Sequence, residues 1–364
     1  MNMNEVLSRF SLKGRPTACT PYGNGHIHRT WRVETDSGAA YILQRINETV
    51  FPDVPALMEN IARVTDYLHG QGLEGRRALT LVPTADGERW LRISGDDGER
   101  AGAYRVYVFI RDSLCLDRAE EARDFRESGA AFGSFQMQMK DFPAQELREI
   151  LPGFHDTAAR CARLRRAVQA DPLGRAASAA REIDGALRRA EGAGEMLEML
   201  DRGELPLRAT HNDTKLNNVL LDACSRRALC VIDLDTVMPG LSGNDFGDSI
   251  RFGANTGAED ERDLERVGLS MVLFEAYAGG FLAACGEALC PAELETLPLA
   301  AELMTFECGV RFLTDYLEGD AYFRIHRPLH NLERARAQLH LAADMARRRD
   351  EMRKAIRRLS PRRF

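Results

Sequence analysis

The first third of the chain contains short runs of alternating apolar and polar residues, which is the pattern of β-strands. A turn with two glycines at residues 22–25 lies between a short run at residues 19–21 and the next run, and further turns separate the others. The later runs occupy residues 30–34, 40–46 and 105–110. They predict a small antiparallel sheet between residues 17 and 110.

One helix interrupts this β-rich region. Apolar residues recur at three- and four-residue steps within residues 54–68, as Leu57, Ile61, Val64 and Leu68, and Gly70 follows them. That spacing places the four side chains on one face of a helix, and glycine is a common helix terminator. We therefore predict a β-β-β-helix-β lobe.

Helical periodicity begins at residues 124–139 and continues to the end of the chain, with one β-rich interruption at residues 209–237. Within it, the runs 219–221 and 228–234 flank the polar turn 222–227, which predicts a hairpin inside a helical lobe. The last segment, residues 347–363, carries nine Arg or Lys residues. We interpret it as the solvated end of a long helix.

Composition narrows the class of protein. The chain has 364 residues, 44% of them hydrophobic and 29% charged, which is typical of a globular protein large enough for two lobes. The net charge of −6 and the scattered basic residues argue against nucleic acid as a partner. Eight cysteines without a Cys-x-x-Cys pair indicate reduced thiols. We found no signal peptide and no run of eighteen apolar residues, so we expect a cytoplasmic protein without a membrane partner.

The strongest chemical signal is the sequence HNDTKLNN at residues 211–218, followed by a predicted hairpin that ends near Asp233. Phosphoryl transfer needs one carboxylate to accept a hydroxyl proton, and an amide oxygen and a second carboxylate to hold magnesium. The hairpin would carry Asn218 and Asp233 to the same end of its sheet. Polar residues also cluster at ordinary turns, but their order here, combined with the strand pair, favours a kinase.

At these motifs the sequence resembles aminoglycoside phosphotransferases and choline kinases, which are distant relatives of protein kinases. It resembles bacterial N-acetylhexosamine 1-kinases more closely. The resemblance rests on residues 21–27, 41–44, 51–53, 210–220, 232–240, 245–254 and 307–320. It implies a two-lobed α+β fold of the protein-kinase type. Residues 1–110 would form the nucleotide-binding lobe, and residues 111–364 a helical lobe with the catalytic loop, the metal site and the sugar site.

The resemblance also implies roles for single residues in the helical lobe. Asp213 would be the catalytic base, and Asn218 and Asp233 would bind Mg²⁺. A literal Asp-Phe-Gly begins at Asp245, but Asp233 matches the metal-binding position better. Asp245 would instead hydrogen-bond the catalytic loop through His211 and hold Asp213 in place.

On the nucleotide side, Gly23 and Gly25 would belong to the loop over the ATP phosphates. Backbone groups of Val108, Phe109 and Ile110 would bind adenine.

One position departs from the family pattern. Gln44 occupies the strand position at which many relatives have a Lys or Arg that pairs with the phosphates. The phosphate charge then has to be met by another group, either Arg45 or magnesium.

The resemblance further implies that His26, Arg311 and Tyr322, together with Asp213, contact the sugar. Each of the first three has a structural alternative. His26 would cap the glycine turn, Arg311 would pair with Asp315 or Glu307, and Tyr322 would be a half-buried aromatic residue.

The predicted function is transfer of the γ-phosphoryl group of ATP to the anomeric hydroxyl of N-acetylglucosamine or N-acetylgalactosamine, which gives the sugar 1-phosphate and ADP. Two alternatives stay open. The first is a kinase for an amino alcohol or an aminoglycoside, which would require an acidic acceptor pocket. The second is a catalytically inactive nucleotide-binding regulator, which Gln44 suggests and the intact Asp213, Asn218 and Asp233 oppose.

Overall fold

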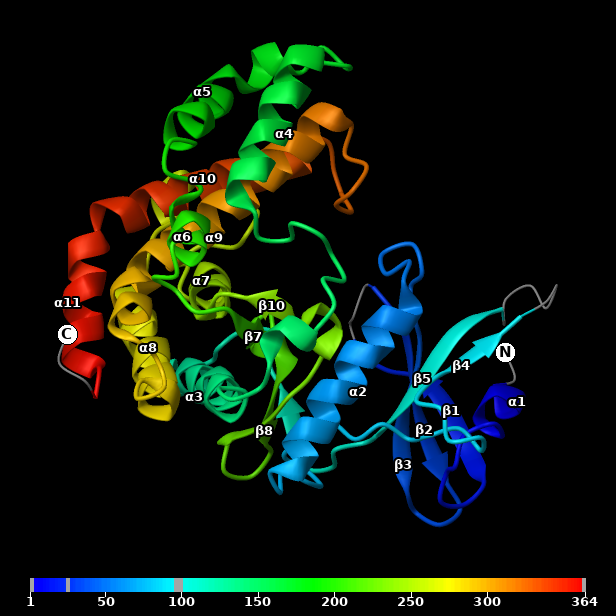
Figure 1. Cartoon of the computed structure of the whole chain (residues 1–364). Coiled ribbons are helices and arrows are strands. Elements are labelled where there is room, and N and C mark those ends of the chain that lie inside the picture. The colour runs from blue at the N-terminus through cyan, green and yellow to red at the C-terminus, as the bar shows by residue number, and fades with distance from the viewer. Residues whose placement is uncertain (1–2, 24–26, 95–100, 362–364) are drawn as a thin grey trace.

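The structure is a computed structural model that describes residues 3–23, 27–94 and 101–361. It has a β-sheet lobe formed by the first part of the chain and a helical lobe formed by the rest (Figure 1). This is the two-lobed α+β architecture that the sequence predicts.

The small lobe contains a five-stranded antiparallel sheet in the order β1-β2-β3-β5-β4. The strands are β1 (Pro16–Pro21), β2 (Arg29–Thr35), β3 (Ala40–Arg45), β4 (Leu91–Ile93) and β5 (Gly102–Val108), and the short helix α1 (Asn4–Leu7) precedes them. The sequence pattern predicts β2, β3, β5 and the end of β1, and misses the three-residue β4. The register places Gln44 of β3 opposite Arg105 of β5.

Helix α2 (Val54–Gly70) follows β3. Its first turn is capped by Asp53, whose carboxylate accepts a hydrogen bond from the backbone N–H of Ala56 at 3.0 Å. The predicted apolar face is buried, and Leu57 and Ile61 have no exposed surface. The helix extends to Gly70, two residues beyond Leu68, and Gln71 follows it.

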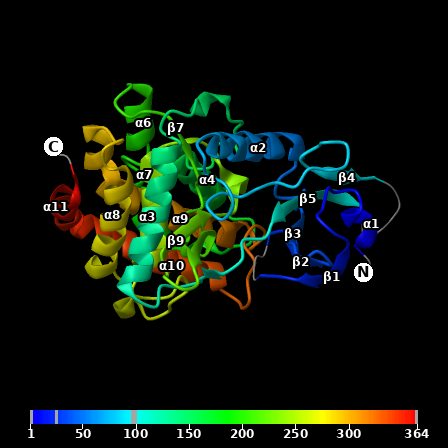
Figure 2. The same ribbon diagram turned by 90° about the horizontal axis from the view of Figure 1, so that it is seen from below.

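Both lobes pack against α2. A single hydrophobic cluster contains Ile61 from α2, Tyr107 from β5, Phe135 from the helical lobe and Val237, which follows the predicted hairpin. Figures 1 and 2 show α2 between the sheet and the helical lobe. The two lobes therefore share part of their core.

The helical lobe is built around α9, a 28-residue helix that packs against α7, α10 and α4. Its helices are α3 (Ala122–Gln138), α4 (Thr157–Ala170), α5 (Ala180–Arg189), α6 (Glu195–Asp201), α7 (Ser242–Gly253), α8 (Met271–Cys285), α9 (Pro291–Glu318), α10 (His330–Arg347) and α11 (Arg349–Leu359). Short 3₁₀ turns lie at η1 (Ala144–Glu146), η2 (Ala176–Ala179), η3 (Leu216–Asn218), η4 (Leu234–Thr236) and η5 (Leu264–Arg266). No helix in the described residues is both long and apolar enough to cross a membrane.

Helices α3 and α8 approach each other closely enough to require glycine at the contact. A Cβ atom on Gly129 would lie 2.2 Å from the carbonyl oxygen of Tyr277, and one on Gly280 would lie 2.0 Å from that of Arg126. Any side chain at these positions would separate the helices.

The predicted hairpin is present in the helical lobe. Strands β8 (Val219–Asp222) and β9 (Ala228–Val231) pair antiparallel, with Val219 opposite Val231, and β6 (Ser113–Cys115) pairs with the other edge of β8. A second small sheet joins β7 (Arg208–Thr210) to β10 (Met238–Gly240). These strands deliver the segments of the candidate active site.

The predicted single C-terminal helix is wrong, because α10 and α11 are separate helices. The break is at Arg348, whose φ of −101° and ψ of 11° depart from helical values. Its guanidinium donates to the carbonyl oxygen of Leu269 at 2.5 Å. This contact outside the helix holds Arg348 at the point where the chain changes direction.

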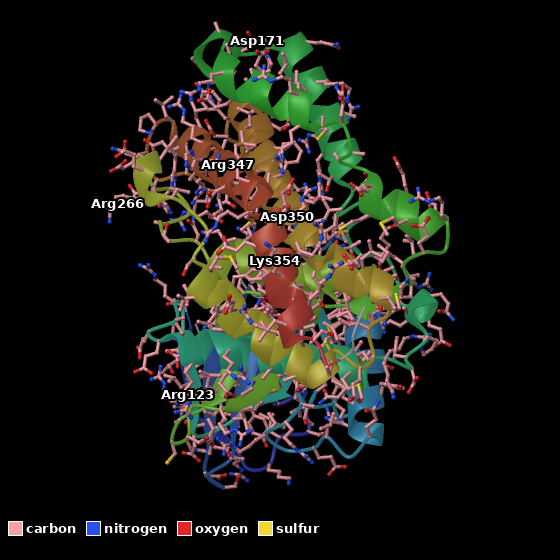
Figure 3. All side chains as sticks on the ribbon, turned by 90° about the vertical axis from the view of Figure 1, so that its left-hand side faces the viewer. Arg123, Asp171, Arg266, Arg347, Asp350 and Lys354 are labelled. Carbon is pink, nitrogen blue, oxygen red and sulfur yellow. The ribbon has the colours of Figure 1, made fainter. Side chains whose placement is uncertain are left out.

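The basic residues of this region are mostly neutralised. Arg349 pairs with Glu302 at 2.6 Å, and Arg358 pairs with Glu275 at 2.6 Å. Figure 3 shows Arg347, Asp350 and Lys354 on the face that α10 and α11 form, with the opposite charge of Asp350 between the two cations. Up to residue 361, where the described part of the chain ends, the segment is therefore a mixed-charge surface rather than a cationic one.

Candidate active site

Asp245, in the first turn of α7, holds the loop that contains Asp213. Its carboxylate accepts hydrogen bonds from the backbone N–H groups of His211 at 3.0 Å and Asn212 at 2.8 Å, and from the side chain of Gln136 at 2.7 Å. Burial raises the pKa of Asp245, although His211 and these hydrogen bonds oppose the shift. Asp245 thus contacts the loop as the sequence suggests, but through the backbone N–H of His211 rather than its ring.

The His211 ring has its own structural contacts. Its Nδ1 accepts a hydrogen bond from the backbone N–H of Asp213 at 3.3 Å, so Nε2 carries the proton and donates to the carbonyl oxygen of Ile232 at 2.9 Å. Phe132 and Phe135 contact the ring edge-on, with centroids 5.3 and 6.1 Å away. The imidazole therefore ties the loop to the end of the hairpin.

Asn212 and Asp248 also support the loop, and the sequence did not indicate this role for either. Asn212 has a left-handed backbone with φ of 63°, and its side chain donates to the carbonyl oxygen of Thr236 at 2.9 Å. The backbone N–H of Thr214 donates to Asp248 at 2.9 Å. Asp248 also pairs with Arg251 at 2.9 Å in the core.

Asp213 is held by a lysine and an amide. Its Oδ1 lies 2.7 Å from Nζ of Lys215, and its Oδ2 accepts a hydrogen bond from Nδ2 of Asn218 at 2.9 Å. Burial alone would raise the pKa of Asp213, but Lys215, His211 and the hydrogen bond from Asn218 together outweigh it and the pKa is lowered. The carboxylate is thus kept ionised, the form that accepts a proton. Lys215 was not predicted, and its only sequence signal is its position two residues after Asp213.

Asp233 lies beside Asn218 at the end of the hairpin, as the sequence predicts. The backbone N–H of Ile232 donates to the carbonyl oxygen of Asn218 at 2.9 Å, which brings the two segments together. Burial raises the pKa of Asp233 well above its ordinary value, and the carboxylates of Asp235 and Asp213 raise it further. The carboxyl groups of Asp213, Asp233 and Asp235 are therefore close enough to affect one another electrostatically.

This donor set fits a hard divalent cation. With Nδ2 of Asn218 committed to Asp213, its amide oxygen and the Asp233 carboxylate are the oxygen ligands that Mg²⁺ prefers. The described residues contain no group of three or more His, Cys, Asp or Glu side chains placed to hold a metal. A magnesium ion here would depend on nucleotide phosphates for further ligands, which is usual for this ion.

Gln44 belongs to a buried network that joins the lobes. Its Oε1 accepts a hydrogen bond from Nε of Arg105 at 2.9 Å, and the guanidinium of Arg105 makes two hydrogen bonds to Asp235. His28 contacts the same carboxylate at 2.5 Å. Burial alone would raise the pKa of Asp235, but Arg105 and His28 outweigh it and the pKa is strongly lowered. Arg45, the expected alternative cation, instead donates to the carbonyl oxygen of Ala101.

The glycine turn and the segment 108–110, both expected to bind the nucleotide, contact each other through two aromatic rings. Gly23 has a φ of 77°, and the ring of the preceding Tyr22 lies 5.8 Å from that of Phe109, edge to face. The backbone N–H groups of Val108 and Phe109 already donate to other backbone carbonyls. An adenine contact would therefore fall to the remaining backbone groups, those of Ile110 included. Gly25 and His26 lie outside the described residues.

Arg311 and Tyr322 line one cavity of about 220 Å³. The Arg311 guanidinium lies 5.3 Å from the ring centroid of Phe154, 5.9 Å from Tyr322 and 5.5 Å from Phe323. Among the described residues it has no ion-pair partner. The expected alternative, pairing with Asp315 or Glu307, is therefore not seen. The cavity is lined by Leu151, Pro152, Phe154, Arg160, Arg163, Arg311, Thr314, Asp315, Glu318, Tyr322 and Phe323.

The acidic groups near Arg311 are bound elsewhere. Asp315 accepts hydrogen bonds from the backbone N–H groups of Tyr322 at 2.8 Å and Phe323 at 2.9 Å. Glu318 pairs with Arg163 at 2.5 Å. The nearby Glu307, whose pKa Arg311 helps to lower, is hydrogen-bonded by His155 and Thr157. Arg311 therefore lines the cavity without an ion-pair partner in the described part of the chain.

Cys308 precedes Arg311 by three residues in α9. Burial raises the pKa of Cys308 to about 11, and both Arg251 and Arg311 act against this rise.

Comparison with known proteins identifies a family and similar folds. Residues 18–280 match the phosphotransferase enzyme family. Among solved structures, an aminoglycoside phosphotransferase from Alicyclobacillus acidocaldarius is 16% identical with a TM-score of 0.62, and the match covers 97% of this chain and 94% of that one. A microcompartment-associated aminopropanol kinase is 16% identical with a TM-score of 0.58, covering 96% and 97%. The amicoumacin kinase hAmiN, solved with AMP-PNP and Ca²⁺, is 15% identical with a TM-score of 0.59, covering 98% and 93%.

Proposed function

Because the chain belongs to the phosphotransferase enzyme family, we propose that it transfers the γ-phosphoryl group of ATP to the anomeric hydroxyl of an N-acetylated hexosamine. The products are the sugar 1-phosphate and ADP. The bond between the γ-phosphorus and the bridging oxygen of ATP breaks, and a bond from that phosphorus to the sugar oxygen forms. The hydroxyl proton goes to Asp213.

The residues of the loop divide this work. Asp213 is the base, and Lys215 keeps it ionised until the proton arrives. Asp245 and His211 fix the loop so that the carboxylate reaches the hydroxyl. Asn218 and Asp233 are the residues that would hold Mg²⁺, which neutralises the polyphosphate charge when bound. An anomeric hydroxyl suits this site because the ring oxygen makes it more acidic than an ordinary alcohol.

The observation that supports a sugar acceptor is Arg311, which lines an aromatic cavity and has no ion-pair partner among the residues that the structure describes. Aminopropanol and aminoglycosides carry ammonium groups, which Arg311 would repel. The two carboxylates that line the cavity are already bound to protein groups. A neutral sugar instead offers hydroxyl and acetamido oxygens to the guanidinium, and its apolar ring face suits Phe154, Tyr322 and Phe323.

An acceptor panel tests the proposal. ADP release is measured with N-acetylglucosamine, N-acetylgalactosamine, their 1-deoxy analogues, 1-amino-2-propanol and an aminoglycoside, and phosphorus NMR locates the phosphate. We expect turnover with the two sugars, and inhibition without ATP consumption by the 1-deoxy compounds, which lack only the acceptor. Turnover of the amines alone, or phosphate at another carbon, would replace this proposal by the amine-kinase alternative or by another acceptor position.

Arg311→Met tests the cavity itself. Loss of the guanidinium should lower kcat/KM for the sugar by about 1–3 kcal/mol, because buried polar groups of the ligand lose their partner, with a much smaller change in the KM for ATP. Arg334→Met is the matched control, since Arg334 also lies over an aromatic ring, 5.3 Å from Phe312, but does not line this cavity. Equal sugar kinetics in both variants would move the acceptor away from Arg311.

A further inference from the structure

The geometry points to Arg105 of β5 as a positioning residue. Its guanidinium supplies the buried positive charge that Gln44 of β3 does not provide. Arg105 fixes Asp235, and through it the segment that carries Asp233, against the sheet of the small lobe. The inference rests on the phosphoryl transfer proposed above, because it assigns Asp233 a role in binding the metal and the nucleotide. It explains how the site can work although Gln44, at the position of the usual Lys or Arg, carries no charge.

The strand register explains why Arg105 can replace a cation at position 44. Gln44 and Arg105 are directly opposite each other on antiparallel neighbours, so their side chains lie on the same face of the sheet. In protein kinases the corresponding lysine is on β3 and pairs with a glutamate of the following helix. Here the amide oxygen of Gln44 accepts a hydrogen bond from Arg105, and its NH₂ group donates to the hydroxyl of Thr30 at 3.2 Å. Arg105 is thus one strand away from the position that holds the lysine elsewhere.

The helix partner is also replaced. The acidic residues in the body of α2 are Glu59 and Asp66, and both are on the surface. Glu59 pairs with Arg63 at 2.9 Å, and Asp66 pairs with Arg89 at 2.9 Å. The buried carboxylate that Arg105 pairs with is therefore Asp235 of the helical lobe.

Both ion-pair partners of Asp235 in the described part of the chain, Arg105 and His28, come from the small lobe. Arg105 binds both carboxylate oxygens, with one hydrogen bond of 2.8 Å, and His28 contacts the same Oδ2 at 2.5 Å. His28 is oriented in turn, because its Nδ1 accepts a hydrogen bond from the backbone N–H of Asn47 at 3.0 Å. Arg105 and Asp235 are only 1% and 3% exposed. A buried ion pair with this many hydrogen bonds allows few other arrangements.

The link from Asp235 to Asp233 is short and bent. Asp233 has a left-handed backbone with φ of 61°, and the 3₁₀ turn η4 starts at the next residue. Asp235 lies in η4, so a shift of its carboxylate displaces Asp233. Residues that orient metal ligands in this way affect metal affinity or activity by roughly 10- to 100-fold when they are changed.

The test moves the cation back to β3. Three variants are compared with the wild type: Arg105→Gln, the double variant Gln44→Lys with Arg105→Gln, and the control Arg92→Gln, which removes an exposed arginine of the same sheet. Calorimetry measures ADP binding with and without Mg²⁺, and kinetics measure kcat and the Mg²⁺ concentration for half-maximal activity. Far-ultraviolet circular dichroism and thermal unfolding check that each variant is folded.

We expect Arg105→Gln to weaken Mg²⁺-dependent ADP binding and to lower kcat by roughly 10- to 100-fold. ADP binding without metal and the acceptor KM should change little. The lysine at position 44 should recover at least about tenfold of the loss, since it lies on the same face as Arg105. Arg92→Gln should match the wild type.

Two results would overturn the inference. One is a folded Arg105→Gln protein with wild-type magnesium dependence. The other is a folded double variant no better than Arg105→Gln. If Arg105→Gln does not fold, Arg105→Lys takes its place, and the expected result is again a defect confined to metal-dependent nucleotide binding. Because ADP binding needs no acceptor, the inference can stand even if the acceptor panel refutes the sugar proposal.

Discussion

Replacement of Asp245 by asparagine isolates the hydrogen bonds that hold the catalytic loop. The side chain keeps its shape, loses its charge, and exchanges one acceptor oxygen for an NH₂ group. In the structure, Oδ2 accepts from His211 and Gln136, and Oδ1 accepts from Asn212. The best arrangement of the amide keeps its oxygen at the site with two donors and turns NH₂ toward the backbone N–H of Asn212.

The magnitude follows from these contacts. One hydrogen bond to a charged group is lost, at about 1.5–3 kcal/mol, and two others become weaker neutral hydrogen bonds. We expect the free energy of unfolding to fall by roughly 2–4 kcal/mol. Because Asn212 directly precedes Asp213, the base should also be displaced. A shift of this kind lowers kcat by about 10²-fold.

Urea unfolding and steady-state kinetics check both numbers. Asp141→Asn is the control, because Asp141 is exposed and its one pair, with Lys140, spans 3.9 Å. That variant should stay within about 0.5 kcal/mol of the wild type in stability. The KM for ATP should be nearly unchanged in Asp245→Asn, since the carboxylate does not touch the nucleotide segments. Wild-type stability and kcat in Asp245→Asn would show that the backbone hydrogen bonds of the loop do not depend on this charge.

Three further predictions concern the base, the metal ligands and a buried ion pair. Asp213→Asn should lower kcat by about 10²–10⁴-fold and leave ATP binding nearly intact, and near-normal turnover in a kinetic assay would exclude Asp213 as the base. Asp233→Ala should abolish turnover and Asn218→Ala should raise the magnesium requirement, whereas unchanged magnesium titrations of both would place the metal elsewhere. Burial alone would raise the pKa of Glu307, but His155 at 3.1 Å, Arg311 and the Thr157 hydroxyl together outweigh it and the pKa is lowered from 4.5. The stability that Glu307 contributes should therefore be complete above pH 4.5 and be lost as the pH falls through its lower folded-state pKa. In urea titrations, the difference in unfolding free energy between the wild type and Glu307→Gln should therefore shrink in acid.

Local patterns were enough to predict the hairpin and the residues at its ends. Apolar runs flank a polar turn, so β8 and β9 had to pair, and pairing of adjacent strands brings Asn218 close to Asp233. The helix α2 was predicted from its apolar spacing for the same reason. These features depend on residues near one another in the sequence.

Contacts between distant segments could not be predicted in this way. Arg105 and Gln44 are 61 positions apart, and their pairing depends on a sheet order that places β5 beside β3. The alternative cation considered from sequence, Arg45, follows Gln44 directly, and adjacent strand residues point to opposite faces. Lys215 was missed because a lysine in a loop gives no periodic signal, and its contact with Asp213 depends on how the loop folds.

The core shared around α2 has a consequence for how the protein melts. Ile61 packs in the same apolar cluster as Tyr107 of the sheet and Phe135 of the helical lobe. Neither lobe can lose its structure without exposing surface that belongs to the other. Heating should therefore give one calorimetric transition, with a van't Hoff enthalpy close to the calorimetric enthalpy, as a single cooperative unit does. A protease cut in the segment between the sheet and α3 should leave the two fragments associated, because the interface that joins them is a hydrophobic core.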